Sequence, residues 1–182
     1  MELCASDGWR SVLRDLIIPY ALGDARLGHD VLEVGPGPGM TTDLLREDLE
    51  RLTAVELDEQ LAKSLAERLR GTNVEVVNAD ATRLPFADGR FTGAVSFTML
   101  HHVPTAALQD RLFAEVARVL SSGACFVASD SVASAELSAL HEGDPYNPIE
   151  PATLDARFRS AGFAHVEVRF NEFGWAAQAT KR

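Results

Sequence analysis

One segment constrains the fold of this chain more than any other. An apolar run over residues 31–34 passes directly into Gly35, Gly37 and Gly39, and a helix-like stretch begins straight after them. Glycines at a strand-to-helix turn let the backbone approach a ligand closely, and the first turn of the helix supplies unpaired N–H groups. The segment therefore predicts a β-strand and an α-helix joined by a ligand-binding loop.

The spacing of the glycines indicates which class of ligand the loop can bind. A dinucleotide-binding turn of the form G-x-G-x-x-G needs a glycine at position 40, where this chain has Met40. A phosphate-binding loop needs Gly-Lys followed by Ser or Thr, and the segment has no such sequence. Pro36 and Pro38 also remove two N–H donors that a pyrophosphate would use. The loop favours close packing against a ligand that presents no phosphate.

Short apolar runs alternate with longer amphipathic stretches along the rest of the chain, which is the pattern of a parallel α/β sheet. We expect strands at residues 30–34, 52–56, 74–78, 93–97 and 124–130, and helices at 41–50, 59–70 and 104–120, the last two ended by Gly71 and Gly123. A loop-rich interval at 131–151 is followed by a helix at 152–161 that Gly162 ends. The strands expected at 165–170 and 174–180 must form an antiparallel hairpin, because a parallel pair needs a crossover of about a dozen residues.

Acidic residues stand at the ends of the second and third expected strands. Glu56 is placed to accept two hydrogen bonds from a ribose diol, whereas Asp58 is the expected N-cap of the next helix. Asp80 follows the third strand, where its carboxylate can accept a bond from an adenine amino group. In an open α/β sheet the carboxyl ends of the strands around the reversal of strand order form the ligand crevice, so these groups are expected to converge there.

This ordered series of segments resembles the class I S-adenosylmethionine-dependent methyltransferases, in particular the small-molecule branch that includes ubiquinone and menaquinone methyltransferase-like proteins. Residues 31–39 resemble the nucleoside-binding first motif, 55–58 the second, 78–86 the adenine-side segment, 91–103 the fourth strand, and 118–124 the turn into the fifth. The resemblance implies a single α/β domain over residues 1–182, with a Rossmann-like, doubly wound, mostly parallel seven-stranded sheet, an antiparallel last strand and helices on both faces. Residues 1–28 would form an N-terminal helical flank and residues 131–151 a lid.

The resemblance also implies S-adenosylmethionine as the cofactor and a set of residues that bind it. Glu33 would lie near the methionine amino group, Glu56 would hold the ribose hydroxyls, and Asp80 with Ala81 would contact adenine. The implied cofactor-binding residues are Glu33, Gly35, Gly37, Gly39, Glu56, Leu57, Asp80, Ala81 and Phe97. No metal site is expected.

Some segments depart from the family pattern. Thr92 and Gly93 stand where the family usually has Asp after the residue corresponding to Phe91, and residues 122–124 read Ser-Gly-Ala instead of Pro-Gly-Gly. The Asp/Asn-Pro-Pro-Tyr segment of amino-methylating nucleic-acid enzymes is absent from the end of the fourth strand. The first two departures affect the approaches to the strands more than the cofactor pocket, and the absence of the last segment disfavours a base-modifying role.

His101 and His102 follow the fourth expected strand, at the mouth of the predicted crevice. Methyl transfer is an in-line displacement at a sulfonium carbon, so the protein chiefly aligns the reactants and needs a base only if the acceptor arrives protonated. One interpretation makes His101 or His102 catalytic, since a histidine can remove an acceptor proton near neutral pH. In the other, the pair caps the following segment or packs beneath the cofactor.

Charge and cysteine content restrict the partners. The chain carries 17 Lys and Arg residues and 27 Asp and Glu residues. The resulting net charge of −10 disfavours binding to nucleic acid or to an anionic membrane, because both are negatively charged. Cys4 and Cys125 lie far apart, so they predict a tail thiol and a buried strand thiol and neither a disulfide nor a zinc site. With no signal-like N-terminus and no run long enough to cross a bilayer, we expect a cytoplasmic protein.

The predicted function is methyl transfer from S-adenosylmethionine to a small-molecule acceptor, without nucleic-acid or membrane partners; the sequence indicates no particular oligomeric state. One alternative is a non-catalytic relative that binds S-adenosylmethionine as a partner or regulatory module. Another is a nicotinamide-dependent oxidoreductase, which would lack its third glycine and leave Asp80 without a task.

Overall fold

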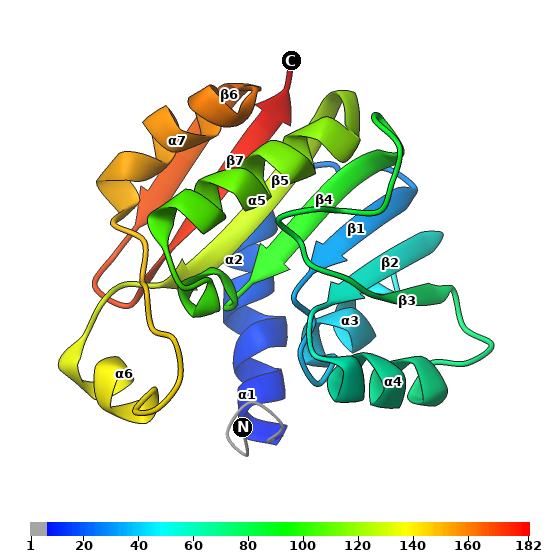
Figure 1. The fold of residues 1–182 in the computed structure, drawn as a ribbon, viewed down its shortest axis with the longest axis horizontal. Helices are drawn as coiled ribbons and strands as arrows, with labels where there is room; N and C mark the ends of the chain where they lie inside the picture. The colour runs from blue at the N-terminus through cyan, green and yellow to red at the C-terminus, as the bar shows by residue number, and fades with distance from the viewer. Residues whose placement is uncertain (1–6) are drawn as a thin grey trace.

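A seven-stranded sheet organises residues 7–182, the part of the chain that the computed structural model describes (Figure 1). The strand order is β3-β2-β1-β4-β5-β7-β6, in which β1 to β5 run parallel to one another and β7 runs antiparallel to both β5 and β6. The expected Rossmann-like α/β fold is confirmed. The strands are β1 (Asp30–Val34), β2 (Arg51–Glu56), β3 (Val74–Asn78), β4 (Phe91–Phe97), β5 (Leu120–Ser131), β6 (Phe163–Phe170) and β7 (Gly174–Lys181).

Helices cover both faces of the sheet because side chains alternate along the central strands. Leu32 of β1 joins a core cluster with α5 (Ala106–Val119) and α7 (Leu154–Ala161), whereas its neighbour Val31 packs on the opposite side. That side is covered by the N-terminal helices and by α3 (Met40–Leu45), with α4 (Glu59–Arg68) packing on β2 and β3. The N-terminal helices are α1 (Asp7–Val12), the π-helix η2 (Leu13–Ile17) and α2 (Ile18–Leu22).

The expected end of one helix and the expected terminator of another are wrong, and in each case the cause is a contact with another element. The helix predicted to reach residue 50 ends at Leu45, since the side-chain amide of Asn73 donates to the carbonyls of Arg46 and Leu49. Gly123 does not end α5, which stops at Val119 because Leu120 already pairs with Phe91 in the sheet. Gly123 instead lies in an irregular start of β5, where its φ of 81° is unstrained for glycine.

The connection from β3 to β4 crosses the sheet without a helix, over residues 79–90. Arg118 of α5 holds it, donating to the carbonyls of Leu84 and Phe86 and to the carboxylate of Asp88. Glu115, one turn earlier, accepts from the Leu84 N–H and from the Arg118 guanidinium. Polar side chains of α5 thus replace the regular hydrogen bonds that a crossover helix would have made.

Thr92 and Gly93, which depart from the family pattern, join β4 to the chain entering β1. The Thr92 hydroxyl accepts from the N–H groups of His29 and Asp30. At Gly93 an added Cβ would lie 2.2 Å from the carbonyl oxygen of Leu27, so no larger residue fits against this backbone. The two residues fix where β1 begins beside β4.

The C-terminal part follows the predicted order. Residues 131–151 contain the short helix α6 (Ala135–Leu140), and η4 (Pro151–Thr153) leads into α7, which ends at Gly162 in the left-handed conformation. The predicted antiparallel hairpin is confirmed, and the Asn171 side chain closes its turn by accepting from the N–H groups of Phe173 and Gly174.

Cys125 lies in β5 as a half-buried free thiol, and burial raises its pKa, whereas Cys4 lies outside the described residues. Over residues 7–182, no helix combines the length and the apolar character needed to cross a bilayer.

Replacing Arg118 with Gln should lower the free energy of unfolding by about 1–3 kcal/mol, because the carbonyls of Leu84 and Phe86 lose a charged donor. Arg14→Gln is the matched control, since Arg14 is exposed and pairs with exposed Asp15; it should change stability by less than about 0.5 kcal/mol. Urea unfolding measures both variants. Equal effects would contradict the role given to Arg118.

Candidate cofactor and acceptor site

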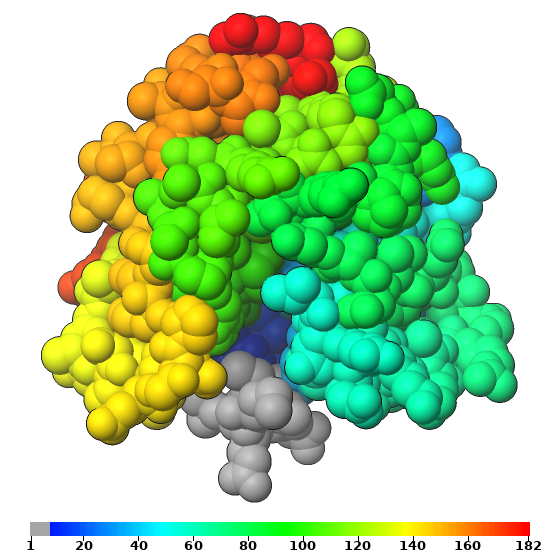
Figure 2. Space-filling model, in the orientation of Figure 1, coloured from blue at the N-terminus to red at the C-terminus, as the bar shows by residue number. Residues whose placement is uncertain are grey.

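The site lies where the order of the strands reverses, between β1 and β4. The carboxyl ends of the parallel strands meet at one edge of the sheet, toward the N-terminal helix in Figure 1. On this edge Figure 2 shows a hollow between the segments coloured green to yellow and those coloured cyan to teal, with the blue N-terminal helix at its floor. Two cavities, of about 440 and 270 Å³, lie elsewhere, beside Arg118 and between α5 and α7.

The three glycines of the loop all have positive φ, but only one of them faces open space. A Cβ at Gly35 would lie 2.1 Å from Cγ of Met99, and one at Gly39 would lie 2.3 Å from a methyl of Leu65. A Cβ at Gly37 would meet no atom within 4 Å. Gly35 and Gly39 therefore serve packing inside the protein, and Gly37 is the position where a ligand can approach the backbone.

Glu56 ends β2 with its carboxylate behind this loop. It is 7% exposed and accepts from the N–H of Gly37 at 2.9 Å and from the N–H of Asp58 at 2.9 Å. A carboxylate has about four acceptor sites, so each oxygen keeps one for a ligand hydroxyl. Asp58 caps α4 as expected, accepting from the N–H groups of Gln60 and Leu61.

Glu33 is a second buried carboxylate at this edge, 1% exposed within β1. One oxygen accepts from the hydroxyl of Thr41. The other oxygen, Oε2, is buried without a hydrogen-bond partner among the described residues. Burial raises the pKa of Glu33 to about 7, and the negative charges of Asp43 and Glu56 add to that rise. Among the described residues, no cationic side chain donates to this carboxylate.

The other residues implied by the resemblance occupy different environments. Asp80 is exposed, and its carboxylate accepts from the N–H of Thr82, so it shapes the turn after β3. Ala81 is half-buried against the core, and Leu57 is 71% exposed beside Glu56. Phe97, at the end of β4, is 4% exposed and packs in the cluster under the N-terminal helices.

The chain leaves β4 through a strained residue. Thr98 has a φ of 51°, which is rare for a β-branched side chain, and its N–H donates to the carbonyl of Ser129. This turn puts Met99 against Gly35 and starts the 3₁₀ helix η3 (Leu100–His102). Both histidines predicted from sequence therefore lie at the carboxyl edge of the sheet.

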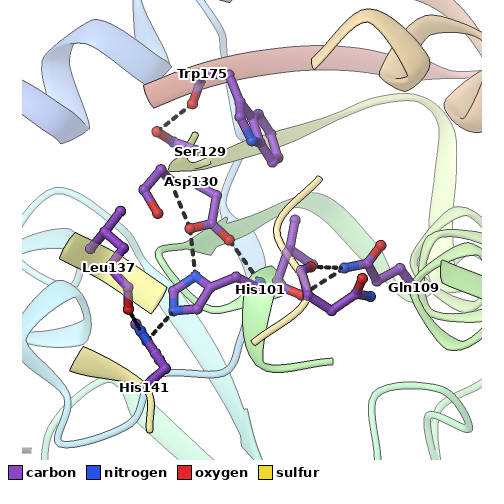
Figure 3. Close-up of polar contacts among 10 residues, drawn as sticks. His101, Gln109, Ser129, Asp130, Leu137, His141 and Trp175 are labelled. Carbon is purple, nitrogen blue, oxygen red and sulfur yellow. Dashed lines mark hydrogen bonds and ion pairs between the residues drawn. The ribbon is translucent and has the colours of Figure 1, made fainter. Parts of the chain in front are cut away.

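His101 is buried between a carboxylate and a third histidine, His141 (Figure 3). Its Nδ1 lies 2.7 Å from Oδ1 of Asp130, whose other oxygen accepts from the His101 backbone N–H. Its Nε2 lies 3.1 Å from Nε2 of His141. His102 is exposed beside them, and partial burial together with the charges of His101 and His141 lowers the pKa of His102.

Residues 141–149 are fastened to η3 by hydrogen bonds. The backbone N–H of Asn147 donates to the carbonyl of His101, and its side chain donates to the carbonyl of Val103. Gln109 of α5 donates to the carbonyls of Leu100 and Asn147. The segment carrying His141 and Tyr146 is thus held beside the histidines.

Sequence reasoning missed Asp130 as a site residue. Asp130 is the penultimate residue of β5 and a buried acid near the end of an apolar strand, which is the same signal that indicated Glu56 at the end of β2. His141 lies in the loop-rich interval at 131–151, and forty positions separate it from its partner His101, so no local pattern pairs the two histidines.

The sheet order, the glycine loop and the strand-end acids define the Rossmann-like methyltransferase class. Residues 32–128, more than half of the chain, match the family model described as a methyltransferase domain. The chain therefore belongs to the methyltransferase domain family.

Curated relatives match only part of the chain. An rRNA adenine N-6-methyltransferase of Saccharopolyspora erythraea is 45% identical over 73 residues, which cover 37% of this chain and 18% of that enzyme. The chain spans less than two fifths of the length of this relative and of the others compared, such as 38% of a ribosomal RNA small subunit methyltransferase A of Bordetella pertussis.

Solved structures match the fold over nearly the whole chain. The PH0226 protein of Pyrococcus horikoshii superposes with a TM-score of 0.79 at 18% identity, covering 98% of this chain and 94% of that one. A phosphoethanolamine N-methyltransferase 2 of Haemonchus contortus, in complex with phosphomonomethylethanolamine and S-adenosylhomocysteine, superposes with a TM-score of 0.71 at 15% identity. That match covers 91% of this chain and 51% of the other.

Glu33 should make the ligand-free protein more stable as the pH falls. Its pKa is about 7 in the fold against an ordinary 4.5, so between these values the folded state binds a proton that the unfolded chain does not. The free energy of unfolding should therefore rise as the pH falls from above 7 towards 4.5, by up to about 1.4 kcal/mol per pH unit from this group.

Urea unfolding at a series of pH values measures this contribution as the difference between the wild type and Glu33→Gln. Glu67→Gln, on the exposed face of α4, is the control and should follow the wild-type profile. Parallel profiles for the wild type and Glu33→Gln would show that Glu33 does not titrate as described.

Proposed function

We propose that this protein transfers a methyl group from S-adenosylmethionine to a small-molecule acceptor. The observation that carries the proposal is the pair of buried carboxylates, Glu33 and Glu56, behind a glycine loop whose middle glycine faces open space. A ligand with one cationic end and a vicinal diol satisfies both groups, and S-adenosylmethionine has both features. Membership of the methyltransferase domain family supports the same ligand.

In the proposed binding mode, different parts of the cofactor contact the ends of different strands. Glu33 Oε2 receives the methionine ammonium, Glu56 accepts from the ribose hydroxyls, and Gly37 lets the cofactor lie against the loop. Asp80 and Ala81, in the turn after β3, lie at the adenine end. Leu57 and Phe97 flank the site, while Gly35 and Gly39 keep the loop in shape. The bound cofactor supplies the electrophilic methyl group, and the protein aligns it with the acceptor.

A small molecule is the proposed acceptor, in keeping with the small-molecule branch of the family. The net charge of −10 disfavours a polyanion. Phe97, Thr98, Met99 and Leu100 stand at the end of β4, in place of the Asp/Asn-Pro-Pro-Tyr segment of amino-methylating nucleic-acid enzymes. We place the acceptor beside His101 and His102, with residues 131–151 as its lid. Of the proposed N-terminal flank over residues 1–28, residues 7–22 form the helices α1, η2 and α2, and residues 1–6 lie outside the described residues.

RNA is the second candidate acceptor. The curated relatives are named as rRNA methyltransferases, and one of them is 45% identical over the matched residues. The matched part is a fraction of those enzymes, so the resemblance supports a shared cofactor site more strongly than a shared acceptor.

Glu56→Ala should weaken S-adenosylmethionine binding by roughly 10- to 100-fold, because the ribose loses a charged acceptor. Calorimetry with S-adenosylmethionine, S-adenosylhomocysteine and nicotinamide dinucleotides measures the effect, and thermal unfolding checks that the loop around Gly37 survives. Glu59→Ala, on the first turn of α4, is the control and should bind as the wild type does. An unchanged affinity in Glu56→Ala would contradict the proposal that Glu56 binds the ribose hydroxyls. A preference of the wild-type protein for a nicotinamide ligand would overturn the proposed function.

The acceptor class can be tested with S-adenosylmethionine carrying a labelled methyl group. We expect label in the small-molecule fraction of a metabolite extract and none in purified ribosomal RNA. Label in the RNA alone would favour the second candidate. Cofactor binding without transfer to either pool would favour the non-catalytic alternative.

A further inference from the structure

We propose that His101, His102 and His141 form a binding site for a divalent transition metal ion of the zinc type. Three of the chain's five histidines gather here, and one ligand atom from each lies within 4.8 Å of the other two. The three rings come from η3 and from the segment after α6, so the fold and not the sequence spacing assembles them. This proposal departs from the sequence expectation of no metal site.

The far nitrogens of two of these rings are held by acceptors. Asp130 accepts from Nδ1 of His101 at 2.7 Å, and the carbonyl of Leu137 accepts from Nδ1 of His141 at 2.6 Å (Figure 3). Histidines that bind metals usually donate their other N–H to a carboxylate or a backbone carbonyl, which fixes the ring and its tautomer. His101 has a carboxylate as this acceptor, and His141 has a backbone carbonyl.

These supports direct the Nε2 atoms of His101 and His141 towards each other. A carbonyl can only accept, so His141 carries its proton on Nδ1. Asp130 accepts from the backbone N–H groups of His101 and Ser131 as well, so its carboxylate is the acceptor and His101 also carries a proton on Nδ1. In their neutral forms the two rings then present Nε2 lone pairs to each other at 3.1 Å, which is repulsive without a positive centre between them.

The spacing of the ring nitrogens is compatible with a bound metal ion. Zinc binds imidazole nitrogen at about 2.0–2.1 Å, so two ligands at a tetrahedral angle lie about 3.3 Å apart. The Nε2 atoms of His101 and His141 are 3.1 Å apart. A proton would join only these two rings, whereas a metal can also use His102, which has a ligand nitrogen within 4.8 Å of those of His101 and His141. The ring centroid of His102 lies 4.2 Å from that of His101 and 5.1 Å from that of His141.

The surroundings leave room for a fourth ligand. His101 is buried, His141 is half-buried under the stacked ring of Tyr146, and His102 is exposed. Three protein ligands with an open position are the pattern of zinc sites that hold water or a substrate atom. An oxygen, nitrogen or sulfur of a small ligand can take that position at the edge of the sheet where β4 ends.

Zinc and cobalt binding to the full chain test the proposal directly. After treatment with a chelator, the protein is titrated with Zn²⁺ in competition with a chromophoric chelator, and with Co²⁺, whose visible absorption reports its coordination. No S-adenosylmethionine is present, so the outcome does not depend on the proposed methyl transfer. We expect one ion per chain and the absorption of four- or five-coordinate Co²⁺.

Single substitutions identify the ligands. His102→Ala and His141→Ala should each weaken Zn²⁺ binding by more than about 100-fold, and Asp130→Asn by about 10- to 100-fold, since it only orients His101. His165→Ala, on the exposed face of β6, is the matched control and should bind as the wild type does. Urea unfolding confirms that His102→Ala and His141→Ala remain folded. Absence of Zn²⁺ binding, or binding that survives His141→Ala, would overturn the proposal.

Discussion

The parallel pairing of β1 with β4 is the constraint on which the rest of the site depends. Val31, Leu32 and Glu33 of β1 lie beside residues 93–95 of β4, although about sixty positions separate them along the chain. Because the two strands end at the same edge, the loop after β1 meets the turn after β4, and Met99 lies against Gly35. A shift in register would move every side chain of the strand to the other face and separate these turns. The hydroxyl of Thr92 and the bare backbone of Gly93 hold the start of that pairing.

Three strand-end carboxylates are buried at this edge, and their partners give them different properties. Glu56 accepts from two backbone N–H groups of the glycine loop and the turn before α4. Asp130 accepts from the ring and backbone of His101, which settles the orientation of that ring. Glu33 has a single hydroxyl donor and a bare oxygen, so burial dominates and raises its pKa to about 7. Burying a carboxylate without a partner is costly, and such groups concentrate at functional sites.

Much of the fold and part of the site were predictable from local signals. The bounds of β1 and β3 agree with the sequence pattern, Asp58 caps α4, and Gly162 ends α7. The end of α3 and the failure of Gly123 to end α5 were not predictable, because Asn73 and the Leu120–Phe91 pairing act on these helices from other elements. The same reason hid the third histidine, since only the hydrogen bonds of Asn147 and Gln109 bring residues 141–149 against η3.

The sequence by itself determined the class of fold, the glycine loop and the strand-end acid Glu56, because strand alternation, glycine spacing and capping act over a few residues. The tertiary structure decided which glycine faces open space, which acid lacks a donor and which histidines meet. Those properties depend on contacts between segments that are distant in the chain: Met99 on Gly35, Glu56 on Gly37, and Asp130 and His141 on His101. A local sequence pattern does not specify such neighbours, because the pairing of the strands in the sheet sets the distances between these residues.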